Sequence, residues 1–234
     1  MQCYFLYSAI DKLYPTVLIS SRNPQVKVVF MNDYDFRNLT GYVDYDRELL
    51  PKLNKTQQIN YFYNKRVKKL ILNPLHEMYV SMMEEKKDSS PLLCFGNCIC
   101  CSIEAFGKFY TGRTERGNSG SNFRKFIEKY MDKEFFSKEF KGKKYVDLLW
   151  DDFRNGIAHG FVIKSGGFEH HQPRYFQIKK IGGRDELEID TQSFYKDFLN
   201  GIKQYINDLK KIRATGAIFR DFNKAFTDLY ITGK

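Results

Sequence analysis

Apolar residues recur along most of the chain with the spacing of an amphipathic helix. From Thr56 they fall three or four residues apart on one face, and the stripe resumes after Pro74 and runs to about Glu85. Proline cannot donate the backbone hydrogen bond that a helix interior needs, so we expect one long helix that is bent or broken near Asn73-Pro74. The stripe comprises Ile59, Phe62, Tyr63, Val67, Leu70 and Ile71, then Leu75, Met78, Tyr79 and Met82.

The next segment, SSPLLCFGNCICCSIEAFGKFYTG, is apolar on nearly every side. Ser90 is a suitable helix cap, Pro91 suits a first helical turn, and Gly112 suits a helix end. A helix without a polar face is normally buried on all sides. We therefore expect this helix to lie at the centre of a bundle.

Further apolar stripes predict four more helices, of which Ser121 opens the first and Thr215 caps the last. Together with the central segment they predict a mainly α-helical bundle. The stripes are Phe123, Phe126, Ile127 and Tyr130; Tyr145, Val146, Leu149 and Phe153; Phe194, Phe198, Ile202, Tyr205, Ile206 and Leu209; and Phe219, Phe222, Phe226 and Leu229.

Two places have the composition of short β-strands joined by turns. VLIS and VKVVFM lie on either side of SRNPQ, and residues 161–163 and 175–178 lie on either side of KSGGFEHHQP. We expect a β-hairpin in each place. The chain then divides into a mixed N-terminal extension, residues 1–55, and a helical bundle with small β-hairpin decorations, residues 56–234.

Composition adds a class of partner to this fold. Hydrophobic residues make up 42% and aromatic residues 16% of the 234 residues, which excludes a disordered chain. The 38 Lys and Arg residues outnumber the 28 Asp and Glu residues and give a net charge of +10. A positive field of this size favours polyanions, among which nucleic acid is the commonest, although it also keeps many proteins soluble.

The cysteines and the N-terminus indicate a compartment. Besides Cys3, the cysteines cluster too closely to form a disulfide framework, so we expect free thiols in a reducing environment. The start of the chain lacks the features of a signal peptide. The longest apolar run is broken by Asn97 and Glu104, and we expect it to be too short to span a bilayer. These features predict a cytoplasmic protein that does not enter a membrane.

Candidate metal ligands occur in two places. Cys94, Cys98 and Cys101 share one face of the central helix, but a zinc site needs paired ligands on a knuckle with further Cys or His nearby. Small thiol side chains also allow close helix packing, which is the other explanation. In EHH, residues 169–171, a predicted loop holds adjacent histidines that would point opposite ways in a strand. We therefore expect no metal and no cofactor.

A polar, glycine-rich stretch, RTERGNSGS, follows the central helix. Its glycines are compatible with an anion-binding nest of backbone N–H groups. No strand–loop–helix phosphate motif surrounds it, and a flexible loop explains the composition as well.

The stretch WDDFRNGIAHGF carries the strongest chemical signal. Asn155 and His159 are four residues apart and share a helix face, and Arg154 provides a permanent cationic fork for phosphate. A neutral imidazole can take or give a proton at cellular pH. Gly156 and Gly160 would loosen the helix and let a polyanion backbone approach. These are the groups needed to cleave RNA without a metal ion.

A structural explanation of the same residues exists. An Arg and a His at the end of a helix also cap carbonyl groups, or pair with a nearby acid such as Asp151 or Asp152. The spacing alone favours this structural explanation.

LLWDDFRNGIAHGF resembles the signature of the HEPN superfamily (higher eukaryotes and prokaryotes nucleotide-binding domains). That signature is an Arg, usually followed by a polar residue such as Asn, and then a His at the end of a bundle helix. The chain has Arg154-Asn155-x-x-x-His159. CICCSIEAFGKFYTG is also similar to the helix that precedes the motif in some members, and the resemblance covers roughly residues 91–211.

The resemblance implies a four- or five-helix up-and-down bundle. Many members of the family are metal-independent endoribonucleases, often toxins or phage-defence effectors, and their active form is commonly a dimer with both motifs facing one cleft. Arg154 and His159 would then be the catalytic pair and Asn155 a supporting polar residue. Glu104, the lone acid on the central helix, would orient Arg154 or His159, or would form a purely structural salt bridge.

The expected partners are RNA, a second copy of the chain and a cognate inhibitor protein. Some toxins of the family carry a Tyr two residues after the His, where a partner enzyme modifies it. This chain has Phe161 there, which lacks a hydroxyl group, so we do not expect that route of neutralisation. Other HEPN domains are not nucleases and serve as binding or dimerisation modules. The two functions differ in whether Arg154 and His159 face solvent or are consumed in a buried salt-bridge network.

Overall fold

The computed structural model describes residues 16–18, 29–31, 49–84, 90–160, 162–170 and 172–233. The chain divides into two compact units, residues 1–52 and residues 53–234. In the first unit β1 (Thr16–Leu18) pairs antiparallel with β2 (Val29–Met31), which confirms the strands of the predicted N-terminal hairpin. The SRNPQ turn lies outside the described residues. The short 3-10 helix η1 (Leu50–Lys52) ends this unit.

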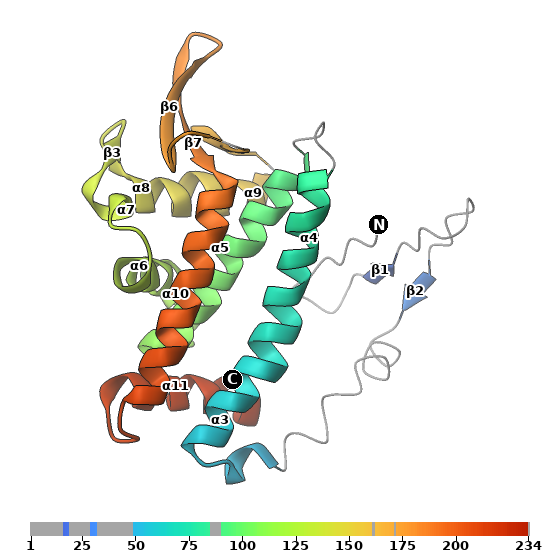
Figure 1. Ribbon diagram of the computed structural model, residues 1–234, viewed down its shortest axis with the longest axis vertical. Coiled ribbons are helices and arrows are strands. Elements are labelled where there is room, and N and C mark those ends of the chain that lie inside the picture. The colour runs from blue at the N-terminus through green and yellow to red at the C-terminus, as the bar shows by residue number, and fades with distance from the viewer. Residues whose placement is uncertain are drawn as a thin grey trace. The chain divides into compact units, whose positions relative to one another are not determined.

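The second unit begins with a continuous helical run made of α3 (Lys55–Tyr61), η2 (Phe62–Leu72) and α4 (Asn73–Glu84) (Figure 1). The helix does not break at the proline. Its middle part is π-helical, and the N–H of Asn73 donates to the carbonyl of Lys68, five residues back. The backbone hydrogen bonds change to the π-helical pattern before Pro74 and do not stop there. This change lets the helix continue although Pro74 has no N–H group to donate.

The central helix is α5 (Ser90–Thr111), which contacts α4, α6, α10 and α11. Figure 1 shows it in the middle of the bundle, as the sequence predicts. Gly112 ends it with a φ of +65°, which glycine adopts without strain. The expectation that this apolar segment is too short to span a bilayer was wrong. With 22 residues, α5 is the one helix of the described chain that is long and apolar enough to cross a membrane, and 56% of that apolar stretch is buried inside the bundle.

The 3-10 helix η3 (Arg116–Asn118) leads into α6 (Ser119–Tyr130), which starts two residues before the predicted Ser121. Its predicted apolar stripe is buried. The backbones of α5 and α6 approach closely at Gly107, where an added Cβ would lie 2.3 Å from the carbonyl oxygen of Asn122. After α7 (Glu134–Ser137), a small hairpin of β3 (Glu139–Phe140) and β4 (Lys143–Lys144) precedes the helix that carries the motif.

A three-stranded sheet follows the motif helix, and its topology differs from the predicted hairpin. The strands are β5 (Gly166–Glu169), β6 (Phe176–Ile181) and β7 (Arg184–Asp190), in the order β5-β7-β6. Residues 162 and 163 are not in a strand, so this part of the predicted strand at 161–163 was wrong, and Phe161 lies outside the described residues. Instead β6 pairs antiparallel with β7 across Gly182-Gly183, which have φ of +57° and +81°, and β5 pairs parallel with β7.

Two helices complete the bundle. Asp190 caps α10 (Thr191–Lys211) by accepting from the N–H of Ser193, and the predicted apolar stripe of α10 is buried. Gly216, and not the predicted Thr215, caps α11 (Ala217–Phe226), which continues into the π-helical η5 (Thr227–Thr232). The mainly helical fold with small β elements is confirmed. Its assignment to a HEPN-like up-and-down bundle stays a prediction.

Candidate functional site

The motif lies on one continuous helical segment made of α8 (Tyr145–Leu148), η4 (Leu149–Arg154) and α9 (Asn155–Gly160). Phe153 is fully buried and anchors the segment to the core. The η4 part is π-helical, with the N–H of Asn155 donating to the carbonyl of Trp150, five residues back. Single π-helical turns inside α-helices occur frequently at functional sites. Here the turn ends at Arg154.

Arg154 is held by three neighbours. Its Nη2 donates to Oε2 of Glu104 at 2.7 Å, and its Nη1 donates to Oδ1 of Asn155 at 2.8 Å. The guanidinium carbon lies 4.9 Å from the centre of the Trp150 ring, a cation–π distance. The side chains of Arg154 and Glu104 are only 19% and 11% exposed. The predicted contact between Glu104 and Arg154 is therefore present, and it fixes the orientation of the guanidinium.

A second cation shares the Glu104 carboxylate. Nζ of Lys108 lies 3.7 Å from Oε1 of Glu104, while Arg154 occupies Oε2. Sequence reasoning did not single out Lys108, although it lies four residues after Glu104 on the same helix face, where side chains of opposite charge pair. The Nε of Arg154 is buried and has no hydrogen-bond partner within the described residues.

The alternative pairing of Arg154 with Asp151 or Asp152 is wrong. Asp151 lies 3.6 Å from Nζ of Lys143 and 4.0 Å from Nη2 of Arg124, and Asp152 lies 3.9 Å from the same Lys143. These acids are neutralised by cations of α6 and the β3–β4 hairpin. Glu104 of α5 is the acid that positions Arg154.

His159 is exposed, together with its neighbours Ala158 and Gly160 at the end of α9. Within the described part of the chain it has no hydrogen bond or ion pair. Asn155, predicted to support it from the same face, uses its Oδ1 for Arg154. Phe161 lies outside the described residues. Of the catalytic pair that the sequence predicts, Arg154 is thus committed to an ion pair, whereas the imidazole of His159 is open to solvent.

The two glycines of the motif have different surroundings. A Cβ added to Gly156 would come 2.4 Å from the carbonyl oxygen of Val162, whose own N–H donates to the carbonyl of Gly156 at 3.3 Å. The expectation that a polyanion backbone can approach at Gly156 was wrong, because the backbone of Val162 fills the space beside Gly156. A Cβ on exposed Gly160 would meet only Cγ1 of Val162, at 3.4 Å. Gly160, beside His159, keeps room on its outer side.

The cysteine face of α5 is mostly exposed. Cys94 and Cys101 lie at the surface, so the close-packing explanation is wrong for them, while Cys98 is half-buried. The neighbouring Cys100 is fully buried. Burial raises the pKa of Cys98 to about 11. Burial also raises the pKa of Cys101, and the nearby Arg154 opposes that rise. The thiols of Cys98 and Cys101 are therefore protonated at neutral pH.

Within the described part of the chain no three His, Cys, Asp or Glu side chains gather as metal ligands. Glu169 ends β5 instead of lying in a loop, His170 follows it, and His171 lies outside the described residues.

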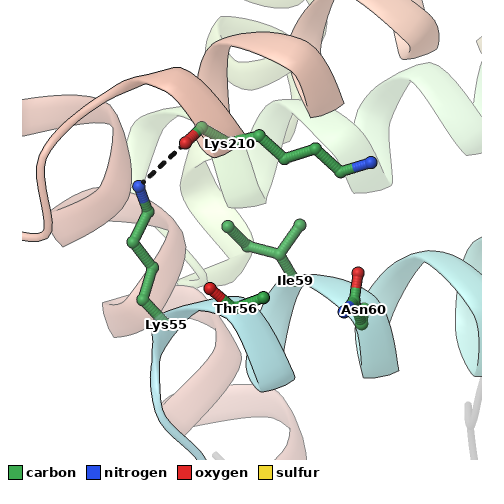
Figure 2. A pocket seen from close by; sticks show the side chains of 5 residues that line it. All are labelled: Lys55, Thr56, Ile59, Asn60 and Lys210. Carbon is green, nitrogen blue, oxygen red and sulfur yellow. Dashed lines mark hydrogen bonds between the residues drawn. The ribbon is translucent and has the colours of Figure 1, made fainter.

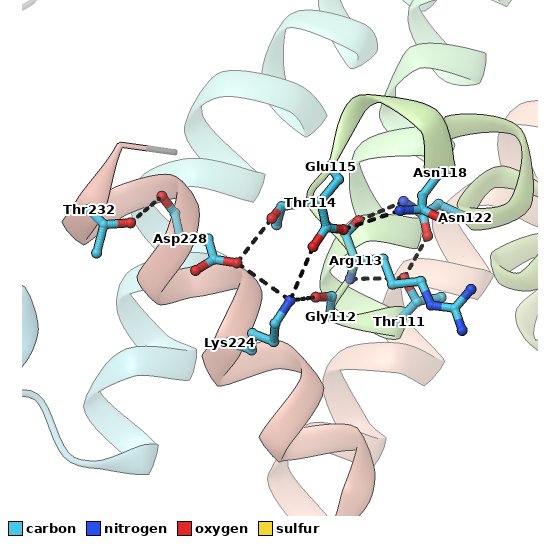
Figure 3. Close-up of polar contacts among 10 residues, drawn as sticks. All are labelled: Thr111, Gly112, Arg113, Thr114, Glu115, Asn118, Asn122, Lys224, Asp228 and Thr232. Atoms are coloured by element: carbon cyan, nitrogen blue, oxygen red, sulfur yellow. Dashed lines mark hydrogen bonds and ion pairs between the residues drawn. The ribbon is translucent and has the colours of Figure 1, made fainter.

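The glycine-rich stretch after α5 is held in place by side chains (Figure 3). Nζ of Lys224 donates to the carbonyl of Gly112 at 2.6 Å, and the hydroxyl of Thr114 donates to Asp228 at 3.0 Å. The N–H groups of Arg113 and Asn118 already have acceptors in Thr111 and Glu115. Side-chain and backbone hydrogen bonds therefore hold both ends of this stretch.

A small pocket of about 170 Å³ lies between α3 and α10 (Figure 2). Lys55, Thr56, Ile59, Asn60 and Lys210 line it. Nζ of Lys55 donates to the carbonyl of Lys210 at 3.2 Å and to that of Ile212. This ammonium group caps the end of α10, where cations are stabilised by the helix dipole, so the pocket has a structural explanation.

No protein-family model, curated protein or solved structure matches the chain. Its function is therefore inferred from the chemistry of the site and the resemblance of the motif.

Proposed function

We propose that the protein is a metal-independent endoribonuclease of HEPN type that acts as a toxin or phage-defence effector through Arg154 and His159. One observation carries the proposal. An exposed imidazole without a partner in the described chain lies five residues after an arginine that a buried carboxylate holds in place. Catalytic sites use such fixed cations beside free bases, because the fixed charge needs no reorganisation when the reaction occurs.

The proposed reaction is a transfer of the phosphodiester within RNA. Neutral His159 takes the proton of a ribose 2′-OH, and the 2′-oxygen forms a bond to phosphorus. Arg154 stabilises the extra negative charge on the phosphorane. The bond from phosphorus to the 5′-oxygen breaks, and this oxygen takes a proton from a general acid. The products are a 2′,3′-cyclic phosphate and a 5′-OH. Glu104 and Asn155 act as positioning residues for Arg154.

The general acid is the second half of the proposal. One bundle offers one motif histidine, whereas the reaction needs a proton acceptor on one side of phosphorus and a donor on the other. A two-fold homodimer brings a second His159 to the same cleft. The net charge of +10 favours RNA as the polyanion that enters this cleft. A cognate inhibitor protein would act by covering the exposed imidazoles.

The test is cleavage of a single-stranded RNA by the purified protein in excess chelator. We expect shortened products that end in 2′,3′-cyclic phosphate, detected by mass spectrometry. Activity that disappears with chelator and returns with Mg²⁺ would contradict the mechanism.

A non-catalytic HEPN-type module that binds RNA or mediates dimerisation is the second candidate. The observation in its favour is that both Nη atoms of Arg154 are already bonded, to Asn155 and to Glu104. A protein that binds RNA in a salt-dependent way but leaves it intact under all the conditions above would support this module.

A further inference from the structure

Glu104 is a single carboxylate between two cations. Its Oε2 accepts from Arg154 and its Oε1 faces Lys108, so each oxygen has its own positive partner. All three side chains are largely withdrawn from solvent, at 27% exposed for Lys108, 11% for Glu104 and 19% for Arg154. Charges in such a setting are screened less than charges at an open surface.

The count of charges in this group determines what it can bind. An ion pair of Arg154 and Glu104 has no net charge and attracts a phosphate only weakly. With Lys108 included, the net charge of the group is +1, because two cations surround one carboxylate. Nζ of Lys108 lies 3.7 Å from Oε1 of Glu104, an ion-pair distance, and its three N–H groups can donate to another oxygen.

We infer that Lys108, Glu104 and Arg154 form a net-positive site for the phosphodiester of RNA. Lys108 supplies the uncompensated charge and contacts the phosphate, and Glu104 holds both cations. The inference rests on the proposed function, since it names the part of the RNA that the same site binds. It also explains how an arginine already in an ion pair still serves an anionic substrate.

A purely structural role for Lys108 is the competing explanation, since Glu and Lys four residues apart on a helix form weak stabilising pairs. The two explanations differ in their effect on RNA binding, which a structural pair leaves unchanged. A probe that the protein cannot cleave separates binding from chemistry. A single-stranded RNA oligonucleotide with 2′-O-methyl groups throughout is such a probe, because it lacks the attacking hydroxyl.

The experiment measures the dissociation constant of this probe at several NaCl concentrations. We expect Lys108→Ala to weaken binding about tenfold, the effect of one charge-assisted contact, and to lower the salt slope by about 1. Lys108→Arg should retain binding. Lys129→Ala, which removes an exposed lysine of α6, is the matched control and should change affinity less than about twofold. Glu104→Gln should tighten binding, because it raises the net charge of the site.

The outcomes separate this inference from the proposed function. Salt-dependent binding that falls in Lys108→Ala, without cleavage of unmodified RNA, would support the inference and contradict the nuclease. Cleavage by the wild-type protein with unchanged binding in Lys108→Ala would overturn the inference and leave the nuclease standing. A wild-type protein that does not bind the probe would overturn the inference as well. Thermal melting of each variant shows whether it is folded.

Discussion

Two polar clusters, one built around Glu104 of α5 and one just beyond the end of α5, use the same kinds of residue in opposite proportions. At Glu104, one carboxylate lies between the cations of Lys108 and Arg154. At the end of α5, one cation, Lys224, lies between the carboxylates of Glu115 and Asp228, at 3.8 Å and 3.6 Å (Figure 3). The first cluster keeps a positive charge for an anion from outside, whereas the second is net negative and repels one. An excess of positive charge makes the first cluster a candidate binding site for an anion, whereas the second cluster has a purely structural role.

The clusters also differ in exposure. The side chains of Lys224 and Glu115 are 53% and 65% exposed, and ion pairs of this kind contribute little to stability because water and salt screen them. Glu104 and Arg154 are mostly buried, and burying charges carries a desolvation cost that only good geometry offsets. Buried charges of this kind cluster at functional sites, although structural networks also contain them.

The largest expected difference between the clusters is in catalysis. His159→Ala should lower RNA cleavage at least about 100-fold, because it removes the general base, and should leave RNA affinity nearly unchanged. Lys224→Ala should leave cleavage unchanged. Rates are measured with a labelled single-stranded RNA at saturating concentration. Cleavage that persists in His159→Ala would remove the reason for treating the Arg154 cluster as an active site.

Mixed dimers test whether that active site needs both subunits. Dimers with one wild-type and one His159→Ala chain can be purified with two different affinity tags. If one His159 acts as base and the other as acid, the mixed dimer should be nearly as inactive as the double mutant. Half of the wild-type activity in the mixed dimer would show that each subunit works alone.

A moderate difference is expected in stability. Arg154→Ala leaves the buried Glu104 with Lys108 alone and should lower the free energy of unfolding by about 2 kcal/mol. Lys224→Ala breaks exposed contacts and should lower it by about 1 kcal/mol or less. Urea denaturation measures both. Adding Glu104→Gln to Arg154→Ala should restore part of the loss, because no unpaired buried charge remains, and a further loss would contradict this account.

The smallest effect concerns the Cys101 thiol next to the site. Arg154 opposes the burial-driven rise in the pKa of Cys101. Replacing Arg154 by Gln should raise that pKa further, lower the fraction of thiolate, and slow alkylation of Cys101 at pH 8 by about twofold to threefold. Peptide mass spectrometry gives the rate for each cysteine. Lys224→Ala is the control and should not change it, and equal rates in the wild type and Arg154→Gln would show that the guanidinium field does not reach the thiol.

The sequence predicted those parts of the molecule that depend on neighbours within one element. The apolar stripes located α5, α6 and α10, and the lone acid on an apolar helix indicated that Glu104 needs a cation. The strand β7 was missed because its charged sequence, RDELEID, hides the fact that Glu188 is buried and paired with Lys179. The filling of the space at Gly156 by Val162 was also missed, because that contact depends on how the chain returns after α9.

The π-helical turn of η4 gives the motif a dependence on chain length. A π-turn contains about one residue more than the α-helical turn that it replaces. If this turn became an ordinary α-helix without losing a residue, all later residues would be rotated by about 100° around its axis. Arg154 would then leave the Glu104 carboxylate, while His159 would turn with it. The extra residue of the π-turn is therefore part of what directs Arg154 towards Glu104, and a change that removes the π-turn but keeps the residue would separate the two side chains.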